Sequence, residues 1–236
     1  MKVGASLLAS AVYCERRLLL PRPATLKHVE PDKSIVRGRE IHELAAAETL
    51  APENYLDILR KTKKLTWFSE GTLTTEYKGI VIVGRFDAAL ASYRGLRLLV
   101  ERKVKTGPLP RYPSRAAVFQ AMLYTWLHEK NNVKLNNTEV EVDICSERFC
   151  PIHLVRNRLD FCTKRCSFSR RIRWKYDDPS LCKHKKEIVN YRCKDEFMKK
   201  LDRLINVLLG KIEPELPDPS LCAKCKWRSV CDMYNK

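Results

Sequence analysis

One apolar segment limits how this chain can fold more than any other feature, because it must be buried and yet ends in charge. Residues 98–100 read Leu-Leu-Val, within a run over residues 96–104 whose composition predicts a strand. The charged sequence Glu101-Arg102-Lys103 follows at once. A charged pair at the end of a buried strand is typical of the lip of a cleft. The sequence therefore predicts a core sheet with a polar site where this strand ends.

A second strand is expected upstream of this one. Residues 80–83 are apolar and β-branched, and Asp87 lies shortly after them. We expect residues 80–83 to pair with residues 96–104 as an antiparallel hairpin that turns about Arg94. Such a turn places Asp87 opposite Glu101.

These side chains suit phosphate chemistry. Glu101 and Lys103 are two residues apart, so they project from one face of the strand. The carboxylates of Asp87 and Glu101 repel each other unless a cation lies between them, and oxygen ligands with incomplete coordination suit Mg²⁺ or Mn²⁺. Lys103 would then orient the attacking water and stabilise charge on a phosphate. The alternative is a cross-strand ion pair on an ordinary exposed sheet face.

Three further polar residues lie on expected helices. Gln120 and Tyr124 are four apart in a helix predicted over residues 115–129, so both can face one ligand. The alternative for Tyr124 is a ring half in the core with its hydroxyl outside. His42 lies in a helix predicted over residues 34–50, and its alternative is a surface or hydrogen-bonded core histidine.

The remaining elements complete an α/β chain. Helices are predicted over residues 4–20 and 195–209, and strands over residues 139–145 and 152–158. Residues 160–195 depart from this pattern, because they are basic, rich in cysteine and aromatic residues, and lack glycine. We interpret them as an inserted element.

The net charge of the chain indicates a polyanionic partner. The sequence has 45 Lys and Arg against 28 Asp and Glu, a formal charge of +17. The basic residues are spread along the chain and interleaved with aromatics, which favours nucleic acid over a membrane surface. A charge-rich thermophile surface is the alternative, and the single glutamine, Gln120, is compatible with it.

The sequence predicts no membrane span and no secretion signal. Its longest apolar stretches are far shorter than the roughly 20 residues of a spanning helix. The mildly apolar start is interrupted by Glu15, Arg16 and Arg17 without a small-residue cleavage site. We therefore expect a cytoplasmic protein.

Ten cysteines in an intracellular protein indicate metal binding first, with disulfides as the alternative. Cys222, Cys225 and Cys231 form a C-x2-C-x5-C group near the end, and Cys14 stands alone near the start. Four thiolates at such spacings suit structural zinc or an iron-sulfur cluster, and sequence chemistry alone does not choose between them.

Among the other cysteines, Cys162-x3-Cys166 with Cys182 and Cys193 leave three interpretations open: a second metal site, two disulfides or buried thiols. His184 is a candidate ligand, although its Lys-His-Lys-Lys surroundings are more simply a solvated basic patch. These cysteines lie in the middle of the chain, at Cys145, Cys150, Cys162, Cys166, Cys182 and Cys193.

The order of the polar motifs resembles a known nuclease group. Gly38-x3-His42, Gly84-x2-Asp87, Glu101-x-Lys103 and Gln120-x3-Tyr124 occur in the order found in RecB-like PD-(D/E)xK nucleases. Together with Cys14 and the late cysteines, the pattern resembles the CRISPR-associated Cas-four exonucleases. The family motif around the early cysteine usually reads Cys-Pro-Arg-Arg, where this chain has Cys14-Glu15-Arg16-Arg17.

The resemblance implies a fold and a division of the chain. The expected fold is an α/β restriction-endonuclease-like core, with a mixed central sheet flanked by helices and a small C-terminal iron-sulfur module closed by the N-terminal helix. The divisions are an N-terminal helix with a cluster cysteine (1–33), the nuclease core (34–159), the insertion (160–195) and the C-terminal helix with the cluster module (196–236).

The resemblance also implies roles for individual residues. His42, Asp87 and Glu101 would bind Mg²⁺ or Mn²⁺, Lys103 would act in catalysis, and Gln120 and Tyr124 would line the active site. An iron-sulfur cluster, [4Fe-4S] in preference to [2Fe-2S], would be bound by Cys14, Cys222, Cys225 and Cys231.

The implied activity is a DNA exonuclease that trims single-stranded ends during CRISPR spacer acquisition, with the CRISPR integrase subunits as partners. A non-catalytic nucleic-acid-binding protein with a cluster or zinc is the alternative. That alternative needs the charge and the cysteines but not Asp87, Glu101 and Lys103 together.

Overall fold

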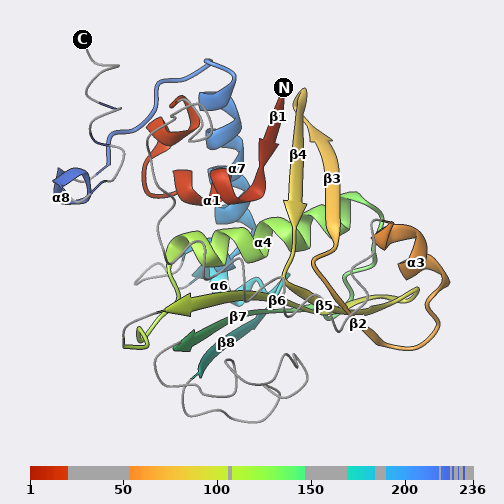
Figure 1. The fold of residues 1–236 in the computed structure, drawn as a ribbon. Helices are drawn as coiled ribbons and strands as arrows, with labels where there is room; N and C mark the ends of the chain where they lie inside the picture. Colours follow the sequence, from red (N-terminus) through yellow and green to blue (C-terminus); the bar gives the residue numbers. More distant parts are fainter. Residues whose placement is uncertain are drawn as a thin grey trace, which may run out of the picture.

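The protein contains two mixed β-sheets with helices packed against them (Figure 1). The structure is a computed structural model that describes residues 1–20, 54–105, 108–146, 169–183, 190–217, 219–223, 225, 228 and 231. The expected mixed α/β class with flanking helices is confirmed, although the strands divide between two sheets. The three-stranded sheet has the order β1 (Lys2–Gly4), β4 (Ile80–Arg85), β3 (Thr72–Tyr77). The five-stranded sheet has the order β2 (Thr66–Ser69), β5 (Ala88–Ser92), β6 (Gly95–Lys105), β7 (Glu139–Ser146), β8 (Ser169–Lys175).

Helix α4 is the central helix and confirms the one predicted over residues 115–129. It runs over Arg115–Lys130, and the Ser114 hydroxyl caps its start by accepting a hydrogen bond from the Ala117 backbone N–H at 3.2 Å. Its side chains are buried on nearly every side, since it contacts both sheets and other helices. Figure 1 shows α4 lying over the five-stranded sheet, with α1 on its opposite side.

The remaining helical segments are short, apart from α7. Helix α7 matches the one expected over residues 195–209. These segments are α1 (Ala5–Ala11), the 3-10 turn η1 (Glu15–Leu18), α3 (Tyr55–Lys61), α6 (Ser180–Lys183), η4 (Asn190–Arg192), α7 (Lys194–Leu208) and α8 (Pro219–Ala223). Within the described part of the chain, none of the helices has the length and apolar character that a bilayer span requires.

One long antiparallel hairpin joins the two sheets. Strands β3 and β4 pair in the three-stranded sheet, and β2 and β5 pair in the five-stranded sheet in the same register. Between these pairs the hairpin bends at Glu70-Gly71 on one arm and Phe86-Asp87 on the other. Backbone hydrogen bonds continue through the bend, from Glu70 N to Asp87 O at 3.3 Å and from Phe86 N to Gly71 O at 3.2 Å.

A glycine makes the bend possible. A Cβ atom on Gly71 would lie 2.4 Å from Cζ of Phe86, whose ring is fully buried beneath it. The Phe86 ring packs edge-on against Tyr55 of α3, so it has little room to move. Only glycine therefore fits where the arm crosses from one sheet to the other.

This bend corrects the predicted hairpin. Residues 80–83 do form a strand, but β4 pairs with β1 and β3 and does not pair with residues 96–104. The hairpin partner of β6 is β5, which begins after the bend, and the turn at Arg94 lies where it was expected. The prediction missed that the chain changes sheets at Phe86.

The helix predicted over residues 4–20 is also shorter than expected. Lys2–Gly4 forms strand β1, α1 ends at Ala11, and the chain resumes as η1 after an extended Cys14. The break turns Glu15 inward, where it is 2% exposed. The helix predicted over residues 34–50 and the strand over 152–158 lie outside the described residues.

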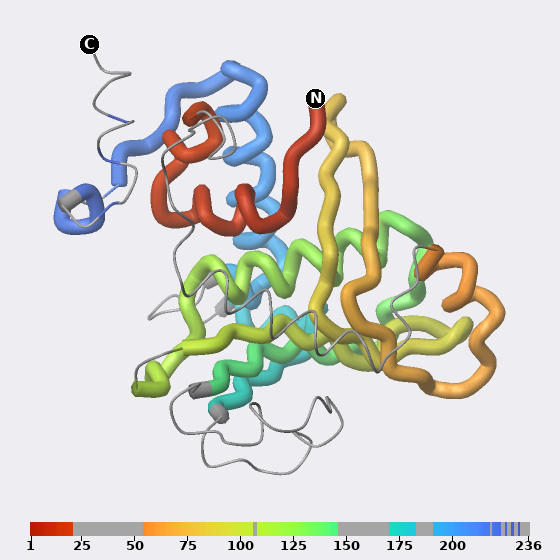
Figure 2. Tube along the Cα trace, in the orientation of Figure 1, coloured from red at the N-terminus to blue at the C-terminus, as the bar shows by residue number. Residues whose placement is uncertain are grey.

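Glu15 joins the beginning of the chain to helix α7. Its carboxylate accepts hydrogen bonds from Lys200 Nζ at 2.6 Å, from Arg203 Nε and Nη2 at 2.8 and 2.9 Å, and from the Glu215 backbone N–H at 2.8 Å. Burial alone would raise the pKa of Glu15, but these donors outweigh it and hold that pKa below its ordinary value. Figure 2 shows the N-terminal segment beside α7 as a result.

Part of the cysteine-rich segment belongs to the five-stranded sheet. Ser169–Lys175 forms strand β8, which pairs with β7 along its whole length. After β8, a disulfide joins Cys182 of α6 to Cys193, the residue that precedes α7. Disulfides were one of the three interpretations open for these cysteines.

We predict that Gly71→Ala lowers the free energy of unfolding by about 1–3 kcal/mol, because the added methyl group overpacks the Phe86 ring. Urea unfolding of the purified variant measures this. Gly4→Ala is the matched control, since a Cβ there meets only Ser6 Oγ at 3.9 Å. Equal stability of the two variants would show that the bend tolerates a side chain.

Candidate active site

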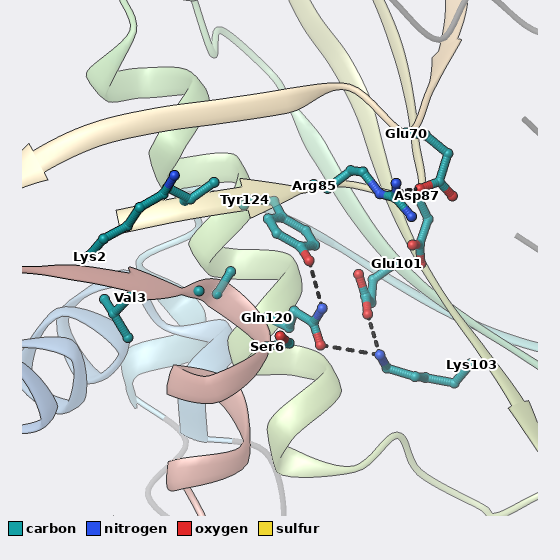
Figure 3. Close-up of a pocket in the computed structure, with 14 residues that line it drawn as sticks. Lys2, Val3, Ser6, Glu70, Arg85, Asp87, Glu101, Lys103, Gln120 and Tyr124 are labelled. Carbon is teal, nitrogen blue, oxygen red and sulfur yellow. Dashed lines mark hydrogen bonds and ion pairs between the residues drawn. The ribbon is translucent and has the colours of Figure 1, made fainter. Parts of the chain in front are cut away.

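A cavity of about 550 Å³ opens beside the bend, between β1, β4, β6 and α4. Figure 3 shows its polar side chains converging from separate elements. The sequence alone pointed to five of them, because they belong to the motifs on β6, on α4 and after β4. The lining residues are Lys2, Val3, Gly4, Ala5, Ser6, Glu70, Val83, Gly84, Arg85, Asp87, Glu101, Lys103, Gln120 and Tyr124.

The two predicted carboxylates line this cavity together. Ala88 pairs with Val100, so the next position of the same register places Asp87 opposite Glu101. The Asp87 Oδ2 atom accepts a hydrogen bond of 2.6 Å from the Arg102 backbone N–H, which fixes its direction. Glu101 is fully buried at the base of the cavity. A buried carboxylate is costly without a cationic partner, so its surroundings determine what the site can do.

Lys103 supplies that positive charge. Its Nζ lies 2.5 Å from Glu101 Oε1 and donates a hydrogen bond of 3.2 Å to Gln120 Oε1. Burial lowers the pKa of Lys103, but the charges of Glu101 and Asp87 more than offset this, so the net shift is upward. Lys103 is therefore an ammonium ion at neutral pH, and it contacts both Glu101 and Gln120.

Gln120 and Tyr124 extend this chain along α4. Gln120 Nε2 donates to the Tyr124 hydroxyl oxygen at 2.7 Å, which leaves the phenolic hydrogen available as a donor. Burial, followed by the charges of Glu101 and Asp87, raises the pKa of Tyr124 well above its ordinary value. A Cβ on Gly84 would lie 2.8 Å from the Tyr124 ring, so the glycine of the Gly84-x2-Asp87 motif lets this ring approach β4.

The donor set fits a hard divalent cation. Asp87 and Glu101 provide carboxylate oxygens, which Mg²⁺ and Mn²⁺ prefer, and Mg²⁺ commonly uses one or two carboxylates with waters and a substrate phosphate. Within the described part of the chain, the acidic residues of this cavity do not bring three ligand atoms within 4.8 Å of one another. A cation would therefore complete its coordination with water or substrate oxygens.

Sequence reasoning missed two charged residues of the cavity, Glu70 and Lys2, and gave Arg85 no role. Glu70 has a φ of 55° at the bend, and its side chain forms an ion pair with Arg85 at 2.8 Å. The sequence Glu70-Gly71 between two strands is the signal that could have indicated Glu70. The expected ligand His42 and its Gly38 lie outside the described residues.

The cysteines expected to bind a cluster come from both ends of the described chain. Burial raises the pKa of the Cys14 thiol, and the neighbouring Cys225 and Cys231 thiols add to that effect, while Arg16 Nη1 lies 3.9 Å from Cys231 Sγ. Sulfurs around one zinc ion lie about 3.8 Å apart, given a Zn–S bond of about 2.3 Å. No three of Cys14, Cys222, Cys225 and Cys231 meet within 4.8 Å in the described structure. Cys225 and Cys231 thus lie near Cys14, but within the described residues the four thiols do not form a closed shell for one zinc ion.

The middle cysteines are only partly described. Cys145 is a buried free thiol in β7, whereas Cys150, Cys162 and Cys166 lie outside the described residues, as does His184. Ligand atoms of Cys182, Cys193 and Asp195 lie within 4.8 Å of one another, but the two sulfurs are joined to each other.

Comparisons with known proteins give a structural likeness only. No family profile and no curated protein matches the sequence. An exonuclease, provisionally so named, from Eubacterium rectale has a TM-score of 0.48 at 12% identity, with 99% of this chain and 87% of that chain covered. The alkaline exonuclease of Laribacter hongkongensis has a TM-score of 0.41 at 13% identity, with 89% of this chain and 90% of that chain covered. A phage-related exonuclease of Haemophilus somnus has a TM-score of 0.41 at 16% identity, with 87% of this chain and 96% of that chain covered.

A buried histidine beneath the site has a defined tautomer. His128 Nδ1 lies 2.7 Å from the Tyr124 carbonyl oxygen, so it must donate, and Nε2 then accepts from the Tyr55 hydroxyl at 3.0 Å. Complete burial lowers the pKa of His128 to about 4. The ring is neutral in the folded protein at neutral pH.

We predict that this histidine destabilises the fold in acid. The unfolded chain binds the proton near pH 6.5 and the folded protein only near pH 4, so stability is lost as the pH falls through that window, by up to roughly 3 kcal/mol. Urea unfolding at a series of pH values measures the slope. His128→Gln is the comparison, because other titrating groups act equally in both proteins. If the free energy of unfolding depended on pH equally in the wild type and in His128→Gln, the lowered pKa of His128 would be contradicted.

Proposed function

We propose that this protein is a divalent-metal-dependent nuclease that cleaves DNA at the cavity formed by Asp87, Glu101 and Lys103. The observation that supports it is the fully buried Glu101 beside Asp87 and the Lys103 ammonium, in a cavity open to solvent. An ordinary ion pair on an exposed sheet face, the alternative considered from sequence, does not require burial of the carboxylate.

The cation has a defined place in this proposal. Asp87 and Glu101 would hold Mg²⁺ or Mn²⁺, with His42 as a third ligand expected from the motif order. The ion would supply charge neutralisation and Lewis-acid polarisation of a phosphodiester. The net charge of +17 supports nucleic acid as the partner, because phosphates attract such a surface over a long range.

The side chains of the cavity have separate roles. Lys103 stays protonated, so it stabilises negative charge on a phosphate oxygen and orients the attacking water rather than removing a proton. Gln120 positions Lys103 through its carbonyl oxygen and Tyr124 through its amide. Tyr124 keeps its proton and donates it as a hydrogen bond to a phosphate oxygen.

The finer assignment follows the motif resemblance. It makes the protein a PD-(D/E)xK exonuclease of the Cas-four type that acts on single-stranded ends in the cytoplasm, trimming new CRISPR spacers beside the integrase subunits. An iron-sulfur cluster at Cys14, Cys222, Cys225 and Cys231 belongs to the same proposal. The proximity of Cys14 to Cys225 and Cys231 supports a shared site.

We predict that Asp87→Asn and Lys103→Met each reduce Mg²⁺- or Mn²⁺-dependent cleavage of single-stranded DNA by at least about 10²-fold. Asp87→Asn keeps an oxygen for the Arg102 backbone N–H, so the fold should survive. Gel analysis of end-labelled oligonucleotides, with melting temperatures recorded for each variant, measures both effects.

Arg97→Ala is the matched control, since Arg97 lies on β6 with Lys103, is exposed and does not line the cavity. Undiminished cleavage by folded Asp87→Asn protein would remove the carboxylate site from the mechanism. Tight DNA binding by a wild-type protein that never cleaves would favour the non-catalytic alternative.

We also predict that protein purified without oxygen is brown and contains iron and acid-labile sulfide, and that Cys14→Ser loses both. Elemental analysis and visible absorption measure this. The control is a double variant, Cys182→Ser with Cys193→Ser, because these two cysteines form a disulfide with each other and are not among the four proposed cluster ligands. Zinc without iron or sulfide would replace the cluster with structural zinc, and full metal content in Cys14→Ser would move the fourth ligand to another cysteine.

A further inference from the structure

An arginine at the rim of the cavity is held in place by a buried acid. Arg85 Nε lies 2.8 Å from Glu70 Oε2. The Glu70 side chain is only 8% exposed, whereas that of Arg85 is 59% exposed. Figure 3 shows this pair beside Asp87, at the end of the cavity away from Gln120. The nucleic-acid chemistry proposed above gives this pair no role.

The backbone at the bend fixes the direction of Glu70. Its φ of 55° is rare for a residue with a side chain, and its N–H donates to Asp87 O across the bend. Gly71 follows directly and is held against Phe86. The backbone thus fixes the direction in which the Glu70 side chain leaves the bend, and that side chain is largely buried, whereas most of Arg85 is exposed.

The pair leaves donors of the guanidinium available for an anion. A guanidinium has five N–H donors in a planar fork, and the contact with Glu70 uses the one on Nε. The cavity is lined by the acids Glu70, Asp87 and Glu101 and by the cations Lys2, Arg85 and Lys103. Lys103 lies 2.5 Å from Glu101. Arg85 is the cation beside Asp87, and most of its side chain is exposed to an approaching strand.

We infer that Arg85 binds a backbone phosphate adjacent to the one that is cut, and that Glu70 is a positioning residue that aims its guanidinium. This inference rests on the proposed function. Arginine suits the task because its fork can meet two oxygens of one phosphate while one edge stays on Glu70. In the competing role, Arg85 only neutralises the charge of Glu70 and makes no contact with the nucleic acid.

Binding measured without cleavage separates the two roles. Fluorescence anisotropy of a labelled oligo-dT, in EDTA and at a series of salt concentrations, gives the affinity and its salt dependence. Arg85→Ala should weaken binding about fivefold to tenfold and reduce the slope of log affinity against log salt by about 0.7, the value for one phosphate contact on a single strand. Arg85→Lys should retain the slope but lose part of the affinity, because a point charge replaces the fork.

Glu70→Gln tests the positioning role. It should weaken binding less than Arg85→Ala, and the double variant should bind as Arg85→Ala does, because Glu70 acts only through the arginine. A direct repulsion between Glu70 and DNA would instead make Glu70→Gln bind more tightly. Arg97→Ala, an exposed arginine outside the cavity, is the control for the loss of one surface charge.

An unchanged affinity and salt slope in folded Arg85→Ala protein would overturn the inference, whatever its cleavage activity. If the wild type binds with the expected dependence on Arg85 but shows no metal-dependent cleavage, the phosphate contact stands and the proposed nuclease function fails. Because Arg85→Ala removes the ion-pair partner of the largely buried Glu70 carboxylate, melting temperatures are recorded for each variant and binding is compared between folded proteins only.

Discussion

The bend in the long hairpin is the constraint on which the site depends. A continuous register runs through β2, β3, β4 and β5, yet the two halves lie in different sheets. Residues at a bend leave the alternating pattern of a flat strand, so their side chains project into the space between the sheets. That is how Glu70 and Asp87, from opposite arms, come to line one cavity. The fit of Gly71 against Phe86 allows the arms to approach closely enough for this.

Charge in the cavity is arranged around one buried acid. Removing a carboxylate from water is expensive, and Glu101 is stabilised by the adjacent Lys103 ammonium, itself held by Gln120. Such an arrangement is a poor way to strengthen a fold, because two apolar side chains would pack there at lower cost. The proposed metal and phosphate site would give a reason to keep it. Asp87 accepts a hydrogen bond from the Arg102 backbone N–H, which fixes its direction beside Glu101.

The sequence was informative where chemistry and periodicity coincided. The apolar run that ends at Glu101, and the spacing of Gln120 and Tyr124 on a predicted helix, are visible in the sequence, and in the structure these side chains line one cavity. The sequence could not show the change of sheets at Phe86, because a strand that bends keeps the composition of a strand. Glu70 was missed for a related reason: a left-handed conformation at a glutamate has no residue preference to reveal it. The ion pairs of Glu15 join residues too far apart in sequence for local patterns to indicate.

The ion pairs between Glu15 and helix α7 also impose an order on folding during synthesis. Its partner Lys200 lies 185 residues further along the chain. A ribosome that adds roughly 5–20 residues per second would make that lysine on the order of 10–40 s later. Until then Glu15 remains a solvated carboxylate, and α1 lacks its contacts with α7. The long hairpin and α4 can therefore assemble on the nascent chain well before the ion pairs of Glu15 form. Formation of these ion pairs is a late step that only a chain carrying α7 completes.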